Sequence, residues 1–165
     1  MPYFIIKLKI SKEVFKKLST VKLTASQENY LETIYFLAKD HEFTRAIDIS
    51  KKLEVGKSSV TEALRVLASK KLINHSPYGT VTLTLEGNNL AKEVVLKHET
   101  LYRFLSDILG VERGEAMENA CRIEHVISQN VLKKLIAFVE FSREFYFKNS
   151  NFVEEFESFY KKKKE

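Results

Sequence analysis

The chain has 165 residues, of which 44% are apolar and 30% charged, with five glycines, two prolines and one cysteine. This composition predicts a helix-rich protein of one or two small domains, and a single cysteine excludes an internal disulfide. There is no long uncharged apolar stretch, and the apolar run at the start contains Lys7 and Lys9, so we expect a cytoplasmic protein with neither a membrane span nor a signal peptide. The net charge of +5 gathers mainly in the first 22 residues and in Lys161–Lys164, which favours an anionic partner.

Residues 1–22 form a basic N-terminal extension. In residues 4–10 apolar side chains alternate with others as in a strand, and Ser11 can cap a short helix with a dense lysine face. Such a segment either docks on the folded protein and presents its lysines to DNA, or acts only as a solubilising leader.

The next part of the chain has the spacing of a helix-turn-helix followed by a hairpin. Ser26 can cap a helix ending near Asp40, and Thr44 precedes a short helix ending at Leu53. After a tight turn at residues 54–56 a second helix runs to about Lys70. Short strands at 72–75 and 80–84 are joined across residues 76–79, where Pro and Gly favour a turn. We therefore predict a winged helix, with a three-helix bundle and a loose hairpin as the alternative.

The second half of the chain reads as helical throughout. Thr84 can cap a long helix that ends at Gly110 and carries His98 within its apolar stripe. A further helix follows, and Ser128 can cap the next one, which continues to Val139 or beyond. Residues 143–165 contain a last amphipathic helix, whose wide aromatic stripe suits packing or dimer contact.

Cys121, Glu124 and His125 stand at i, i+3 and i+4 and therefore share one helix face. A thiol, a carboxylate and an imidazole so arranged make half of a metal site, and the neighbouring residues are apolar, so a buried carboxylate there needs a partner. In the alternative, Glu124 and His125 face water and Cys121 packs as a small apolar residue. His98 is likewise either a core histidine or a ligand.

These features together resemble the DtxR/MntR family of metal-dependent transcriptional repressors, in the short form that lacks an SH3-like domain. The resemblance covers about residues 23–141 and rests on Leu23–Glu32, Val55–Thr61, Leu83–Gly87, Lys97–His98 and Cys121–Ser128. It implies a mainly α fold in which an N-terminal winged helix-turn-helix domain is linked by a long helix to an all-helical dimerisation domain. The expected divisions are a basic extension (1–22), a DNA-binding domain (23–85), a metal-binding and dimerisation domain (86–142) and a C-terminal helix (143–165).

By position, the resemblance implies a set of metal ligands: Glu32, His98, Cys121, Glu124 and His125, with Asn29 as a sixth candidate. Asn29 stands where the manganese-type branch carries Asp and the iron-type branch Met. Tyr102 and Met117 occupy two ligand positions of the ancillary site found in the iron-type branch, which puts a second metal in doubt. A soft thiolate favours Fe²⁺, with Mn²⁺ next, although the general affinity order also admits Ni²⁺, Co²⁺ and Zn²⁺.

The ligand positions are far apart in sequence, so a shared cation would clamp the DNA-binding domain to the dimer core. In a homodimer this favours the spacing of two recognition helices, roughly 34 Å, that reads a pseudo-palindromic operator. We expect DNA contacts from the start of the recognition helix and from the wing: Lys57, Ser58, Ser59, Thr61, Glu62, Arg65, Tyr78 and Thr80. The alternative for these residues is a solvated helix face.

The predicted function is therefore that of a metal-dependent repressor of metal-uptake genes, not an enzyme. Two alternatives remain: a winged-helix regulator that needs no metal, and a redox sensor that uses the Cys121 thiol. A metalloenzyme would need a base beside the cation, and no phosphate loop or nucleophile elbow supports one.

Overall fold

The computed structural model describes residues 21, 23–40, 43–76, 79–145 and 152–163. The predicted N-terminal extension (except Val21) and the wing residue Tyr78 lie outside this part of the chain. The elements follow in the order α2 (Ala25–Asp40), β1 (Thr44–Arg45), α3 (Ala46–Leu53), α4 (Lys57–Ser69), β2 (Ile73–His75), β3 (Thr80–Leu83), α5 (Leu85–Arg103), the π-helical turn η1 (Phe104–Ile108), α6 (Arg113–Glu124), α7 (Gln129–Phe145) and α8 (Phe152–Lys162). No helix of the described ranges has the length and apolar character that crossing a membrane requires.

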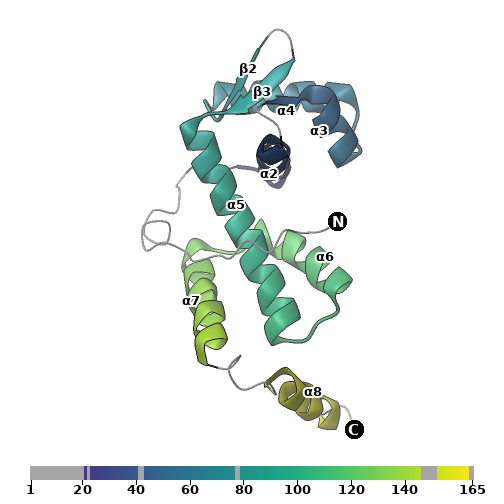
Figure 1. The fold of residues 1–165 in the computed structure, drawn as a ribbon, viewed down its shortest axis with the longest axis vertical. Coiled ribbons are helices and arrows are strands. Elements are labelled where there is room, and N and C mark those ends of the chain that lie inside the picture. The colour runs from purple at the N-terminus through teal and green to yellow at the C-terminus, as the bar shows by residue number, and fades with distance from the viewer. Residues whose placement is uncertain (1–20, 22, 41–42, 77–78, 146–151, 164–165) are drawn as a thin grey trace.

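Three helices and a small sheet form the predicted winged helix (Figure 1). The antiparallel sheet has the order β1-β3-β2, with Thr44 opposite Val81 and Ile73 opposite Leu83. Its core consists of fully buried aliphatic side chains from every helix of the unit and from both wing strands, among them Leu31, Ile34, Ile49, Leu64, Leu67, Leu72 and Val81. The paired sheet excludes the alternative of a helical bundle with a loose hairpin.

Two local details of this unit differ from the sequence prediction. Helix α2 is capped by Thr24 rather than Ser26, because Thr24 Oγ1 accepts from Gln27 N while Gln27 Oε1 accepts from Thr24 N, both at 3.3 Å. This reciprocal pair is a capping box, which satisfies two donors where Ser26 would satisfy one. The strand β1 at Thr44–Arg45 was not predicted, since two residues are too short to show alternation.

Helix α5 starts in close contact with the wing. Thr84 caps it as predicted, accepting from Gly87 N at 3.0 Å, and its hydroxyl donates to Lys71 O at 2.8 Å. Gly87 lies flush against the start of β2, because a Cβ at that position would be 1.8 Å from Leu72 O. Only glycine permits this approach of helix and strand.

The lower half of α5 is enclosed by α6 and α7 (Figure 1). Leu96 of α5 packs with Leu132 and Ile136 of α7 in a second small core. The predicted long helix is α-helical only to Arg103, because Leu109 N bonds to Phe104 O five residues earlier and so produces the π-helical turn. This difference leaves the predicted end intact, since Gly110 takes a positive φ of 68° after the turn.

Helix α8 lies at the end of the molecule away from the wing (Figure 1) and contacts η1. A Cβ at Gly110 would lie 3.0 Å from Glu157 Oε1 and 3.2 Å from Val153 Cγ1, both on α8. Phe156 and Tyr160 stack along the helix at 6.4 Å between ring centroids, while Phe159 is 61% exposed. The aromatic stripe of the sequence is therefore only partly covered within one chain.

Candidate metal centre at the junction of α2, α5 and α6

The candidate ligands come from three helices that meet at the middle of the molecule. Helix α5 contacts both α2 and α6 (Figure 1). Glu32 and Asn29 belong to α2, His98 to α5, and Cys121 and Glu124 to α6, with His125 as the C-cap of α6. The junction thus unites segments from both halves of the chain.

The structure brings Cys121, Glu124 and His125 together as the helix spacing predicts. One ligand atom of each lies within 4.8 Å of the others. Glu124 is only 1% exposed, whereas Cys121 lies at the surface and His125 is half-buried. The alternative in which Glu124 faces water is therefore wrong.

His98 joins this cluster through Glu124. Its Nδ1 lies 2.8 Å from Glu124 Oε2, and both side chains are buried. Burial alone would lower the pKa of His98, but the hydrogen bond to Glu124 and the charges of Glu124, Glu32 and Glu99 raise it above its ordinary value. His98 is thus a buried histidine that is hydrogen-bonded to one of the candidate ligands, Glu124.

Glu32 faces the same acidic environment from α2. Burial, followed by the charge of Glu124, raises the pKa of Glu32 from 4.5 to about 7, against the opposing effect of His98 and His125. Among the described residues, Oε1 of Glu32 and Oε1 of Glu124 are buried without a hydrogen-bond partner. Oε1 of Glu124 lies 3.4 Å from Nε2 of His125.

This donor set fits a divalent cation. Oε1 of the half-buried Glu32 and Oε1 of the buried Glu124 are both buried atoms without a hydrogen-bond partner in the described part of the chain, so a cation at the junction would give each oxygen a partner. Oxygen, imidazole nitrogen and thiol sulfur together match the donors that first-row transition metals accept. Asn29, in contrast, is half-buried and makes no side-chain hydrogen bond within the described ranges, so its amide is not tied to the cluster.

The environment of Cys121 bears on the alternative of a redox sensor. Partial burial and the charges of Glu124 and Glu32 raise the pKa of the Cys121 thiol. Reactive cysteines have lowered pKa values, because the thiolate is the nucleophile. The metal-free surroundings therefore suppress the thiolate that redox sensing would use.

The sequence analysis missed Glu28 at this junction, and it placed Met117 only at an ancillary-site position. Glu28 of α2 accepts from Lys97 Nζ at 2.6 Å and pairs with His125 Nδ1 at 2.7 Å. Met117 Sδ lies 3.1 Å from His98 Nε2. A signal for Glu28 was present, because it precedes Glu32 by four residues and shares its helix face.

The predicted DNA-contacting residues of α4 are all exposed: Lys57, Ser58, Ser59, Thr61, Glu62 and Arg65. Glu62 is paired with Arg65 at 2.7 Å, so its carboxylate is neutralised by its own helix. The Thr61 hydroxyl donates to Lys57 O, and Thr80 in the wing is half-buried with its hydroxyl against that of Ser76. Tyr78 lies outside the described residues.

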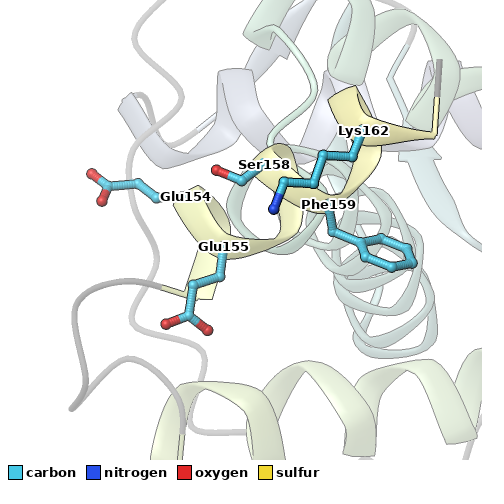
Figure 2. A pocket seen from close by; sticks show the side chains of 5 residues that line it. All are labelled: Glu154, Glu155, Ser158, Phe159 and Lys162. Carbon is cyan, nitrogen blue, oxygen red and sulfur yellow. The ribbon is translucent and has the colours of Figure 1, made fainter. Parts of the chain in front are cut away.

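An open hollow lies on α8, far from this junction. Figure 2 shows the side chains that line it, Glu154, Glu155, Ser158, Phe159 and Lys162. All five come from a single helix, so the hollow does not join different parts of the fold. None of the predicted site residues borders it.

Comparisons with known proteins match both halves of the chain to one family. Residues 22–81 match the family model described as the iron dependent repressor, N-terminal DNA binding domain, and residues 84–145 match its metal binding and dimerisation domain. An uncharacterised HTH-type transcriptional regulator of Methanocaldococcus jannaschii is 34% identical over 119 residues, 72% of this chain and 95% of the relative. The HTH-type transcriptional regulator MntR of Bacillus subtilis is 32% identical over 121 residues, 73% of this chain and 84% of the relative.

Solved structures agree with the sequence relatives. The crystal structure of T. acidophilum IdeR has 27% identity and a TM-score of 0.60, over 71% of this chain and 54% of that one. The manganese regulator SloR has 27% identity and a TM-score of 0.62, over 73% of this chain and 55% of that one. The match thus spans only about half the length of these two structures.

Proposed function

Because this chain belongs to the iron-dependent repressor family, we propose that a divalent metal held between α2, α5 and α6 controls its binding to DNA. The family is one of metal-dependent DNA-binding transcriptional regulators rather than enzymes. The observation that carries the proposal is a pair of buried carboxylate oxygens, Oε1 of the half-buried Glu32 and Oε1 of the buried Glu124, that have no hydrogen-bond partner in the described part of the chain. The proposed ligands are Glu32, His98, Cys121, Glu124 and His125, with Asn29 as a further neutral oxygen donor.

A bound cation would give the two unpartnered Oε1 atoms of Glu32 and Glu124 a partner. Glu32 approaches the junction from α2, which packs against α3 and α4 of the DNA-binding unit. Cys121, Glu124 and His125 approach it from α6 and its C-cap. A metal shared by α2, α5 and α6 would restrict the movement of the winged helix relative to α5 and α6, which favours one arrangement of the recognition helices.

We favour Fe²⁺ as the physiological metal, with Mn²⁺ next. The Cys121 thiolate is a softer donor than a carboxylate, and Asn29 adds no negative charge that would favour the harder Mn²⁺. A relative is named MntR, and a solved structure is titled a manganese regulator, which supports Mn²⁺ as the runner-up.

The DNA-binding form is proposed to be a cytoplasmic homodimer that binds a pseudo-palindromic operator and represses metal-uptake genes. The match to a dimerisation domain supports the dimer. In this arrangement the exposed Lys57, Ser58 and Ser59 at the start of α4 contact phosphates. Arg65 reaches a phosphate or a base edge after leaving Glu62, and Thr61, Tyr78 and Thr80 extend the contact surface to the wing.

The test combines operator selection with metal titration. An operator selected from a random duplex pool in the presence of Mn²⁺ is titrated with the protein under chelator, Mn²⁺, Co²⁺, Zn²⁺ and anaerobic Fe²⁺. We expect tight binding only with metal, and its loss in Glu124→Ala and His125→Ala with the dimer intact by light scattering. Loss of a residue that only hydrogen-bonds to a metal ligand typically lowers metal affinity roughly 10- to 100-fold, so loss of a ligand itself should lower it at least as much.

The alternatives predict different outcomes. Binding that ignores chelator would contradict the proposal and favour a metal-independent regulator. Binding that is abolished by peroxide, and insensitive to peroxide in Cys121→Ser without added metal, would favour a thiol sensor.

A further inference from the structure

Glu28 occupies the space between the two helices that supply the cluster. Its Oε1 accepts from Lys97 Nζ on α5 at 2.6 Å, and its Oε2 lies 2.7 Å from His125 Nδ1 at the end of α6. All three side chains are largely buried, with exposed fractions of 13% for Glu28, 16% for Lys97 and 15% for His125. The ion pair and hydrogen bond of Glu28 are therefore shielded from solvent, unlike those of exposed side chains.

Both carboxylate oxygens of Glu28 already have partners, Lys97 and His125, so neither oxygen is available to bind the metal. A carboxylate that already accepts from an ammonium group accepts from the imidazole as well, which places the proton of His125 on Nδ1. The other ring nitrogen, Nε2, then lies on the side of Glu124, 3.4 Å from its Oε1. An imidazole bound through one nitrogen commonly donates its other N–H to a carboxylate, which fixes the ring and its tautomer.

We propose that Glu28 is a positioning residue that holds His125 with Nε2 directed at the metal site, and that Lys97 holds Glu28 in this role. The inference rests on the proposed function, because it assigns a purpose to the orientation of His125. It also makes a link from the DNA-binding unit to α6 that exists before any metal binds. Glu28, from the first half of the chain, thus determines that Nε2 of His125 is the nitrogen available to the metal.

The first measurement is metal affinity, with Co²⁺ and Mn²⁺ as probes on the full-length protein. Glu28→Ala should bind Co²⁺ about 10- to 100-fold more weakly than wild type. Glu28→Gln keeps an acceptor oxygen in the same place and should recover part of this loss. Glu118→Ala is the matched control, because Glu118 is an exposed carboxylate of α6 that pairs only with Arg122 among the described residues, and its removal changes the net charge equally.

The second measurement reads the ring directly. Long-range proton–nitrogen NMR spectra of ¹⁵N-histidine-labelled, metal-free protein should show His125 protonated at Nδ1 in wild type and a mixture of tautomers in Glu28→Ala. A structural role alone would alter thermal stability without altering the tautomer. Circular dichroism confirms that each variant is folded, and Glu28→Gln serves if Glu28→Ala does not fold.

Unchanged Co²⁺ affinity in Glu28→Ala, or unchanged tautomer populations, would overturn the assignment of Glu28. Failure of the wild-type protein to bind any tested metal would instead overturn the proposed function, and the tautomer spectra would then show separately whether Glu28 orients His125.

Discussion

At the junction, the surroundings of Glu32 raise its pKa by a large amount. Its side chain is half-buried, and desolvation, followed by the charge of Glu124, raises its pKa from 4.5 to about 7. An unfolded chain would release this proton near pH 4.5, whereas the folded metal-free protein holds it until about pH 7. The folded state therefore binds more protons between these values, so the contribution of Glu32 to stability is fully present below pH 4.5 and is lost as the pH rises to about 7.

We predict that the metal-free wild-type protein loses stability relative to Glu32→Gln as the pH rises from 4.5 to 7. The shift corresponds to an upper limit of roughly 3 kcal/mol. Urea denaturation of both proteins in chelator across this range measures the difference. A difference that is constant with pH would show that Glu32 titrates normally in the folded state.

The residue scale also shows how far sequence spacing can define this site. Helix geometry alone predicts that Cys121, Glu124 and His125 share a face, since the contacts are local. The partners of Glu28 lie 69 and 97 residues away, on elements whose packing no spacing rule gives. Glu28 could be suspected from its position four residues before Glu32, but its pairing with His125 could not.

At the scale of elements, the seam between β2 and α5 is the most sterically restricted place in the fold. Gly87→Ala would set its Cβ against the Leu72 carbonyl, so the helix start and the wing would have to separate. Overpacking of this kind costs about 1–3 kcal/mol or more. We expect a thermal transition several degrees lower in Gly87→Ala, together with weaker DNA binding, because the wing is displaced.

The matched control is Gly56→Ala. The nearest atom to a Cβ at Gly56 is Ser58 Oγ at 3.8 Å, and the backbone there is extended with φ −65°. Alanine is a poorer N-cap than glycine but meets no backbone here, so this replacement should cost about 1 kcal/mol or less. Equal stability losses in both variants, measured by calorimetry, would contradict the importance of the Gly87 contact.

The elements themselves were largely predictable, because their signals are local. Thr84, Gly110 and Ser128 act as helix boundaries where sequence patterns place them, with Ser128 Oγ accepting from Val131 N at 3.4 Å. The short strand β1 depends on pairing with β3. The π-helical turn likewise carries no sequence signature, because its residue types do not distinguish i→i+5 hydrogen bonds from the i→i+4 bonds of the preceding helix.

At the scale of the whole molecule, the basic segment at residues 1–22 provides the prediction that concerns DNA most directly. If its lysines contact phosphates, each contact adds about 0.9 to the slope of log affinity against log salt concentration. Deleting residues 1–21 should then flatten the slope and weaken binding to specific and unrelated duplexes alike. Fluorescence anisotropy at several salt concentrations tests this, and an unchanged slope would assign the segment to stability or assembly.

The contact between Gly87 and Leu72 has a mechanical consequence for the whole chain. The first turn of α5 packs on the residues that lead into β2, and Thr84 Oγ1 donates to Lys71 O, so this end of the helix cannot move independently of the wing. His98 lies 11 residues beyond Gly87, about 17 Å along the same helix at roughly 1.5 Å per residue. A sideways displacement of about 1 Å at His98 would therefore tilt the rod by about 3° and rotate the wing with it. Small movements at the junction therefore change the angle at which the wing would contact DNA.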